Sequence, residues 1–130
     1  MKLLLAFAVP AGLLMCQQGA VVANLSTAKW EKDDSVTLRE DPQTGAIELF
    51  VHKPGGYTFA PHWHTANERI LLLEGRMSVR HGVSAEEFLD PGGYAFLPAK
   101  EVQHLACVSK TRCTFYIHWD GKPDFHAAPK

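Results

Sequence analysis

The chain has 130 residues, a length that suits one compact domain and is too short for two of ordinary size. Hydrophobic residues make up 46% of it and charged residues 21%, which excludes a disordered, collagen-like or coiled-coil chain. With 13 Lys or Arg against 14 Asp or Glu and no basic run, it lacks the electrostatic footprint of a nucleic-acid-binding protein, so we expect a small-molecule partner and no nucleic acid.

The first 23 residues have the pattern of a secretory signal peptide. A positive start precedes an apolar run over residues 3–15, and small residues stand before position 24. The apolar run is shorter than the ~20 residues that span a bilayer, which predicts no permanent membrane span. We therefore expect a signal peptide at 1–23 and a secreted or periplasmic domain at 24–130. A lipoprotein signal ending at Cys16 is the alternative, although Met15 before it is bulky for that processing.

In the rest of the chain, the distribution of turn residues is typical of an all-β protein. Turn clusters rich in Gly, Pro and Asp recur at intervals too short for helices and their connections. The strand-like runs between them lie at 46–52, 57–62, 69–73, 76–80, 94–97, 104–108 and 113–119. Residues 26–32 are compatible with one helical turn and residues 36–38 with an edge strand. Many short, closely spaced strands predict a single β-sandwich or β-barrel.

Two of the seven histidines stand at a spacing that suits a metal site. Side chains alternate along a strand, so His62 and His64 leave the same face while Trp63 leaves the other. Glu68 follows after a short polar stretch that can turn the chain, which allows its carboxylate to return to the same point. An isolated His-x-His is more often an ordinary surface or hydrogen-bonded pair, so the assignment depends on what surrounds it.

Those surroundings resemble the first motif of the cupin superfamily. Gly56, His62, His64, Glu68 and Gly75 stand at the spacing of that motif. The early Trp and the Cys-containing final hairpin are similar to small exported cupins, some of which are related to the metal-binding cupin half of anti-sigma factors. The resemblance covers most of residues 30–126 and implies a single-domain cupin jelly-roll β-barrel.

The second cupin motif resembles the segment that ends at His104, with one departure. Lys100 stands where the family has glycine, and His104 comes one residue later after Pro98 than in the family. The resemblance implies that His62, His64, Glu68 and His104 bind one divalent transition metal. Gln103 competes with His104 for the inward position. Nitrogen and oxygen ligands suit Zn, Fe, Mn, Ni, Co or Cu alike, and leave open positions on a six-coordinate ion.

Cys107 and Cys113 flank what reads as a hairpin turn. In an exported protein they form either a cross-strand disulfide or two buried or half-exposed thiols. If they lie opposite each other, the face that carries His104 also carries Tyr116 and His118, which then point inward. These two side chains are candidates for positioning substrate or moving protons, and satisfied core groups are the alternative.

Two functions follow from this site. One is a metal-dependent enzyme, an oxygenase or a Lewis-acid isomerase or lyase, that acts on a small oxygen-rich molecule. The other is a non-catalytic module that binds a small ligand or a metal, and the sequence does not decide whether the protein is an enzyme. A homodimer formed through edge strands is a further expectation.

Overall fold

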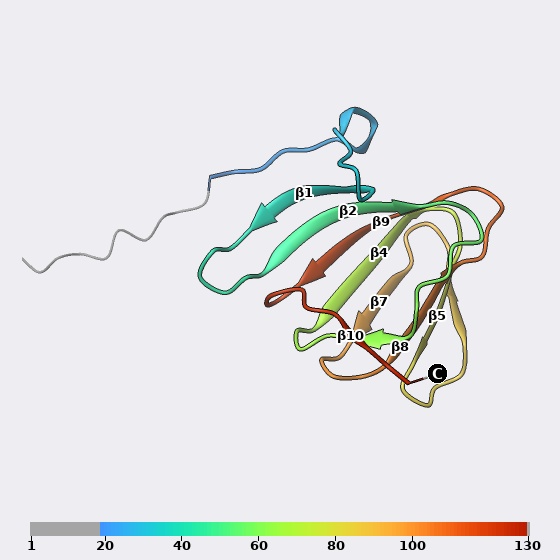
Figure 1. Ribbon diagram of the computed structural model, residues 1–130. Helices are drawn as coiled ribbons and strands as arrows, with labels where there is room; N and C mark the ends of the chain where they lie inside the picture. Colours follow the sequence, from blue (N-terminus) through green and yellow to red (C-terminus); the bar gives the residue numbers. More distant parts are fainter. Residues whose placement is uncertain (1–18, 130) are drawn as a thin grey trace, which may run out of the picture.

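The computed structural model describes residues 19–129, which form two facing antiparallel β-sheets of five strands each (Figure 1). The first sheet has the order β1 (Ser35–Glu40), β2 (Ile47–Lys53), β9 (Cys113–Trp119), β4 (Glu68–Glu74) and β7 (Tyr94–Leu97). The second has the order β10 (His126–Ala127), β3 (His62–Trp63), β8 (Gln103–Cys107), β5 (Met77–His81) and β6 (Glu87–Leu89). The single helix of the described residues is a 3-10 turn, η1 (Leu25–Thr27). The all-β jelly-roll prediction is confirmed.

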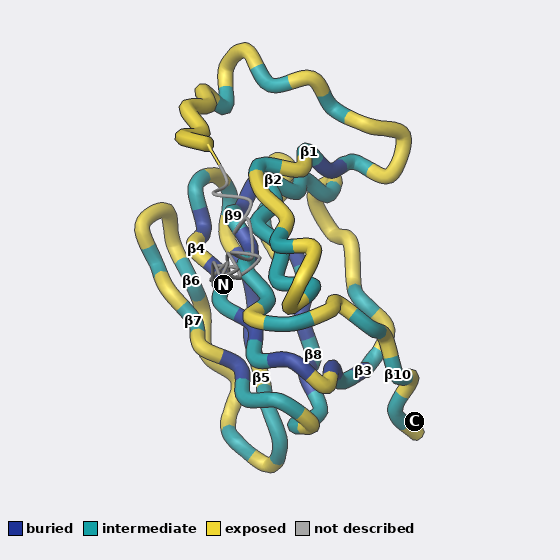
Figure 2. The backbone as a smooth tube through the Cα atoms, turned by 90° about the vertical axis from the view of Figure 1, so that its left-hand side faces the viewer, coloured by how far each residue is buried: buried dark blue, intermediate teal, exposed yellow. Residues whose placement is uncertain are grey.

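The hydrophobic core lies between the two sheets. Alternate residues of β4, β5, β8 and β9 point inward, and Figure 2 shows the buried residues along the strands and the exposed ones at the turns and in the N-terminal segment. Ile70 and Leu72 of β4 and Met77 of β5 are fully buried. Burying one such side chain stabilises the fold by about 1.5–3 kcal/mol, so this layer holds the sheets together.

Most predicted strands are present, and the differences lie in short segments. The predicted strand at 57–62 forms only an isolated bridge at Thr58 and the first residue of β3. The strands β6 and β10, of three and two residues, carry too short a pattern to be recognised and were missed. Residues 1–18 of the predicted signal peptide lie outside the described residues. Within the described part, no helix is long and apolar enough to cross a membrane.

Gly75 occupies the tight turn that carries the chain from β4 in one sheet to β5 in the other. Its φ is 85°, a conformation that residues with a Cβ rarely adopt. A Cβ there would also lie 2.7 Å from the carbonyl oxygen of Arg112. Lys100 has a φ of 65°, so the position where cupins have glycine keeps the left-handed conformation in this chain despite its side chain.

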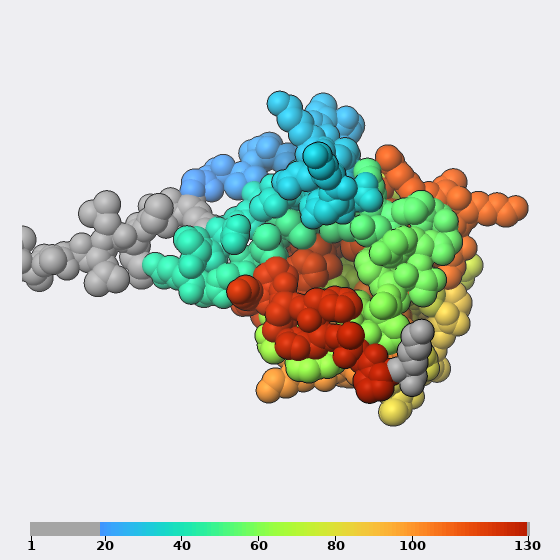
Figure 3. Space-filling view, in the orientation of Figure 1, coloured from blue at the N-terminus to red at the C-terminus, as the bar shows by residue number. Residues whose placement is uncertain are grey.

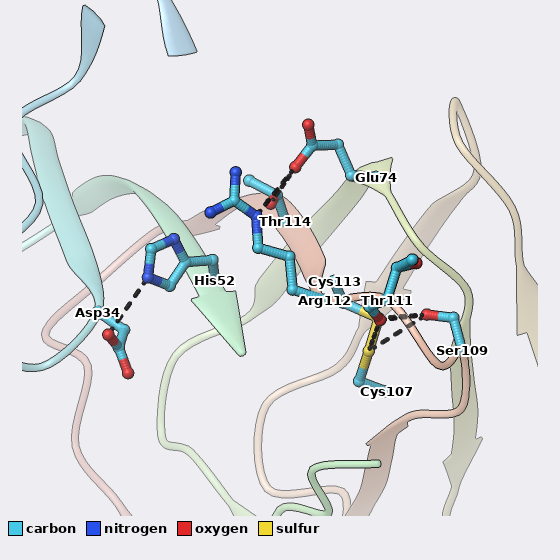
Figure 4. A network of polar contacts seen from close by, with 9 residues as sticks. All are labelled: Asp34, His52, Glu74, Cys107, Ser109, Thr111, Arg112, Cys113 and Thr114. Atoms are coloured by element: carbon cyan, nitrogen blue, oxygen red, sulfur yellow. Dashed lines mark hydrogen bonds and ion pairs between the residues drawn. A yellow bond between two sulfur atoms is a disulfide. The ribbon is translucent and has the colours of Figure 1, made fainter. Parts of the chain in front are cut away.

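Cys107 and Cys113 form a disulfide, with 5.7 Å between their Cα atoms (Figure 4). The sequence-based interpretation placed them opposite each other on paired strands, and this is wrong. β8 pairs with β3 and β5, whereas β9 pairs with β2 and β4, so the disulfide joins the two sheets. Both cysteines are buried in the core and therefore point into the space between the sheets.

Candidate metal centre

His62 and His64 project from β3 and the residue after it into the space between the sheets. They are 5% and 6% exposed, and their ring centroids lie 4.9 Å apart. Trp63 between them leaves the other face, where its ring stacks on His126 at 3.9 Å. The alternation of a β-strand thus places the two imidazoles side by side, as predicted from the spacing.

Glu68 is the first residue of β4 and is 1% exposed. The Asn67 side chain fixes the turn before it, because its amide donates to Asp120 at 2.8 Å and its oxygen accepts from the Ala99 N–H at 2.9 Å. The carboxylate oxygen Oε2 of Glu68 lies 3.2 Å from Nε2 of His64. Ligand atoms of His62, His64 and Glu68 all lie within 4.8 Å of one another, which is close enough to share one ion.

Both imidazoles are oriented through their Nδ1 atoms. Nδ1 of His62 is 2.7 Å from the carbonyl oxygen of Ala60, and Nδ1 of His64 contacts the carbonyl oxygen of Asp124. A carbonyl only accepts, so each Nδ1 carries the proton that it donates. The lone pair of each neutral ring is then on Nε2, the atom that faces the shared centre. A second hydrogen bond of this kind is typical of metal-binding histidines.

The two imidazoles differ in their electrostatic surroundings. Burial lowers the pKa of His62 and keeps this ring neutral, the form that binds metals. Burial also acts to lower the pKa of His64, but the hydrogen bonds to Glu68 and to the Asp124 carbonyl outweigh it and raise that pKa. His64 and Glu68 thus form a buried pair in which the carboxylate favours the protonated form of the imidazole.

Gln103, not His104, lies against the cluster of His62, His64 and Glu68. Gln103 is 1% exposed, pairs with His62 across β3 and β8, and donates from Nε2 to Oε2 of Glu68 at 2.8 Å. Its Oε1 is buried without a hydrogen-bond partner among the described residues. A buried amide oxygen without a partner, three converging donors and one negative charge together fit a bound cation.

The structure does not bring His104 to the other three expected ligands. It lines a separate cavity on the outer side of β8, together with Arg80 and Glu86. The disulfide explains this: Cys107 points inward, and residues two and four positions before it share its face. Counting back from Cys107 therefore places Gln103 inside and His104 outside.

Tyr116 and His118 are also on the outer face of their strand, contrary to the prediction that they point inward. The hydroxyl of Tyr116 donates to Glu48 at 2.7 Å, and burial together with this bond raises the pKa of Tyr116. His118 lines a different cavity, beside Asp41 and Glu48. In β9 the inward residues are those that share the face of Cys113, so neither side chain reaches the metal centre.

A cavity of about 210 Å³ opens above the three donors. Its walls are apolar apart from His62, His64 and Glu68; the other lining residues are Val51, Phe59, Leu105, Phe115, Ile117, Trp119 and Phe125. Nε1 of Trp119 is buried without a hydrogen-bond partner among residues 19–129. Trp119 and Phe125 were missed, although Trp119 was recognisable because it alternates with Ile117 and Phe115 along one strand.

Comparison with known families agrees with this geometry. The ChrR cupin-like domain matches residues 18–121. The chain belongs to this cupin family. The predicted similarity to the cupin half of anti-sigma factors is consistent with this match. No curated protein sequence matches the chain.

Solved cupin structures share the fold of this chain at low sequence identity. The cupin domain of Schizosaccharomyces pombe Cnp3 has a TM-score of 0.68 and 14% identity, over 78% of this chain and 69% of that one. A structure of oxalate oxidase has a TM-score of 0.65 and 18% identity, over 88% and 68% of the two chains. The DMSP lyase DddQ from Ruegeria pomeroyi has a TM-score of 0.59 and 17% identity, over 78% of this chain and 56% of that one.

The geometry makes opposite predictions for the two neighbouring residues of β8. His104→Ala is expected to leave the metal affinity of this cupin within about twofold of the unmodified chain, because the ring lies in another cavity. Gln103→Ala is expected to lower it about tenfold, because Glu68 loses the partner that orients it. Isothermal titration with Zn²⁺ measures both, and the reverse order would show that His104 is the fourth ligand.

Proposed function

We propose that this protein is an exported, metal-dependent cupin enzyme that acts on a small molecule through one divalent transition ion held by His62, His64 and Glu68. The observation that carries the proposal is the convergence of three buried donors at the base of a cavity with apolar walls. The export part rests on the sequence of residues 1–23. The ion is one of Zn, Fe, Mn, Ni, Co or Cu, since nitrogen and oxygen donors suit all six.

Each residue of the site has a defined task. An ion bound here would supply Lewis-acid polarisation of a substrate oxygen or, if redox-active, electron transfer. His62 and His64 present their Nε2 atoms, Glu68 lowers the net charge of the site, and Gln103 orients the Glu68 carboxylate. The apolar walls exclude water and hold the body of the substrate.

The walls narrow the expectation of an oxygen-rich substrate. Oxygen atoms close to the three donors have partners, but oxygen atoms elsewhere would face apolar side chains at an unfavourable desolvation cost. We therefore favour a molecule that presents its oxygen atoms at one end. An oxalate oxidase and a DMSP lyase have similar folds, and they support an enzymatic role on a small molecule only by analogy of fold.

A non-catalytic metal- or ligand-binding module is the second candidate. One observation favours it: the titratable side chains that line the cavity are the three proposed ligands themselves. Tyr116 and His118, the expected proton-transfer groups, lie on the outer face of β9. A proton-transfer step would then depend on Glu68 or on a group of the substrate.

Metal analysis followed by turnover assays separates the two candidates. The mature protein is purified without added metal, its metal content is measured, and chelator-treated protein is reloaded with each of the six ions. Oxygen uptake or product formation with a catechol, a flavonol, a thiol, oxalate or DMSP, lost on chelation and restored by one ion, is expected of the enzyme. A tightly held ion without turnover of any of these substrates would indicate the binding module.

Light scattering on the same samples tests the homodimer that we propose to form through the edge strands.

A further inference from the structure

We infer that the C-terminal strap, residues 122–129, completes the metal centre. Asp124 acts as a positioning residue for His64, and Phe125 covers His62 and restricts entry to the cavity. The inference rests on the proposed metal site and extends it to residues beyond the family match, which ends at residue 121. Figure 3 shows the C-terminal residues, in red, lying across the face of the molecule against the green middle of the chain.

Asp124 anchors the strap next to His64. Its carboxylate accepts hydrogen bonds from the backbone N–H of Thr65 at 2.8 Å and from the Thr65 hydroxyl at 2.6 Å. The Nε2 atom of His126 lies 2.9 Å from the same carboxylate. Three contacts on one side chain hold the backbone of Asp124 in place, directly beside the residue that follows His64 in sequence.

The backbone carbonyl of Asp124 then orients the His64 ring. It contacts Nδ1 of His64, and this contact leaves Nε2 as the donor atom for the ion. A carbonyl from a free segment would provide no fixed acceptor, so the anchoring carboxylate of Asp124 acts on the ligand through its own backbone. Second hydrogen bonds to metal-binding histidines commonly change metal affinity 10- to 100-fold.

A second anchor lies beyond Phe125. In β10, His126 pairs with Trp63 and Ala127 pairs with His62, and the N–H of Ala128 donates to the Pro61 carbonyl at 2.9 Å. The stack of His126 on Trp63 adds a ring contact. The strap is therefore tied on both sides of Phe125 to the segment 61–65, which contains β3.

Phe125 is held between these anchors over the metal centre. Its ring stacks on His62, with centroids 4.7 Å apart and planes 20° from parallel, and it lines the cavity above the donors. The residue is 58% exposed, so burial in the core does not explain its position. Its place at the cavity edge instead makes it a cover that limits access of solvent, chelators and ligands to His62.

Binding and release of Co²⁺ test the two roles separately. Asp124→Ala is expected to lower Co²⁺ affinity about tenfold and to alter the visible absorption of the bound ion, because His64 is no longer oriented. Asp124→Asn keeps one oxygen that can accept from the Thr65 N–H and is expected to recover part of the affinity. Phe125→Ala is expected to change affinity less and to speed removal of Co²⁺ by excess chelator about tenfold, because the apolar shell controls solvent access.

Tyr94→Ala is the matched control. Tyr94 is an aromatic residue of similar exposure, 57%, that lies on β7 away from the centre. If Asp124→Ala does not fold, Thr65→Val removes only the hydroxyl contact and is expected to lower affinity in the same direction. If the wild type binds Co²⁺ and the Asp124 and Phe125 variants behave like Tyr94→Ala, the strap inference alone is overturned. Equal Co²⁺ binding by wild type and by a His62→Ala, His64→Ala variant would instead overturn the proposed site and the strap inference with it.

Discussion

A double variant, His62→Ala with His64→Ala, is expected to lose stoichiometric metal. Of the three converging donors only Glu68 remains, and a single carboxylate in a buried site cannot replace the solvation of a divalent ion. We expect metal affinity to fall by at least about 100-fold, since removal of one orienting partner alone costs 10- to 100-fold. Elemental analysis of protein purified without added metal measures the ratio of ion to chain directly.

His118→Ala is the control for this double variant. It also removes an imidazole, but from the outer face of β9, so the ratio of ion to chain should stay at the wild-type value. Circular dichroism of all variants establishes that the β-fold is retained. Stoichiometric metal in the double variant would mean that the ion is held elsewhere and that the proposed ligand set is wrong.

Removal of the disulfide, in a Cys107→Ala, Cys113→Ala variant, is expected to cause a large loss of stability. The two cysteines are six positions apart, and closing so short a loop stabilises the fold by about 2 kcal/mol through the unfolded chain. Both side chains are also buried between the sheets, so their loss leaves space in the core. For a domain of this size, the melting temperature should fall by roughly 10 °C.

Urea unfolding with and without a phosphine reductant measures this effect. The wild type should lose stability on reduction, whereas the double variant should unfold at the same midpoint in both conditions. A wild-type midpoint that is insensitive to a reductant shown to open the bond would contradict the prediction. Mass spectrometry after alkylation confirms that both thiols have been released in the reduced sample.

The sequence predicted the fold well because its signals are local. Turn residues and the alternation of side chains identified β2, β4, β5, β7 and β9, and the cupin spacing added the jelly roll. The two strands without a prediction, β6 and β10, are too short for any pattern to be distinguished from a loop. Their strand character comes from the partners they pair with, β5 and β3.

In the site, predictions for residues close together in the sequence were confirmed, and predictions that depended on distant strands were wrong. His62 and His64 are two residues apart and Glu68 is one short turn away, so the chain itself brings them together. The prediction for His104 depended on which face of β8 is buried. The predictions for Tyr116 and His118 depended on a hairpin pairing that does not exist. Gln103 was considered as the inward residue, and the structure places it against Glu68.

The amino-acid sequence alone thus determined which residues alternate along each strand. It also determined the glycine at the turn between β4 and β5 and the three neighbouring donors. Which of the two faces lies inside depended on how the sheets stack, because a period of two defines two sets of side chains without saying which set is buried. The contacts of Asp124 with His64 and of Phe125 with His62 join residues about 60 positions apart. Such contacts form only when both sheets are assembled, since no local pattern encodes them.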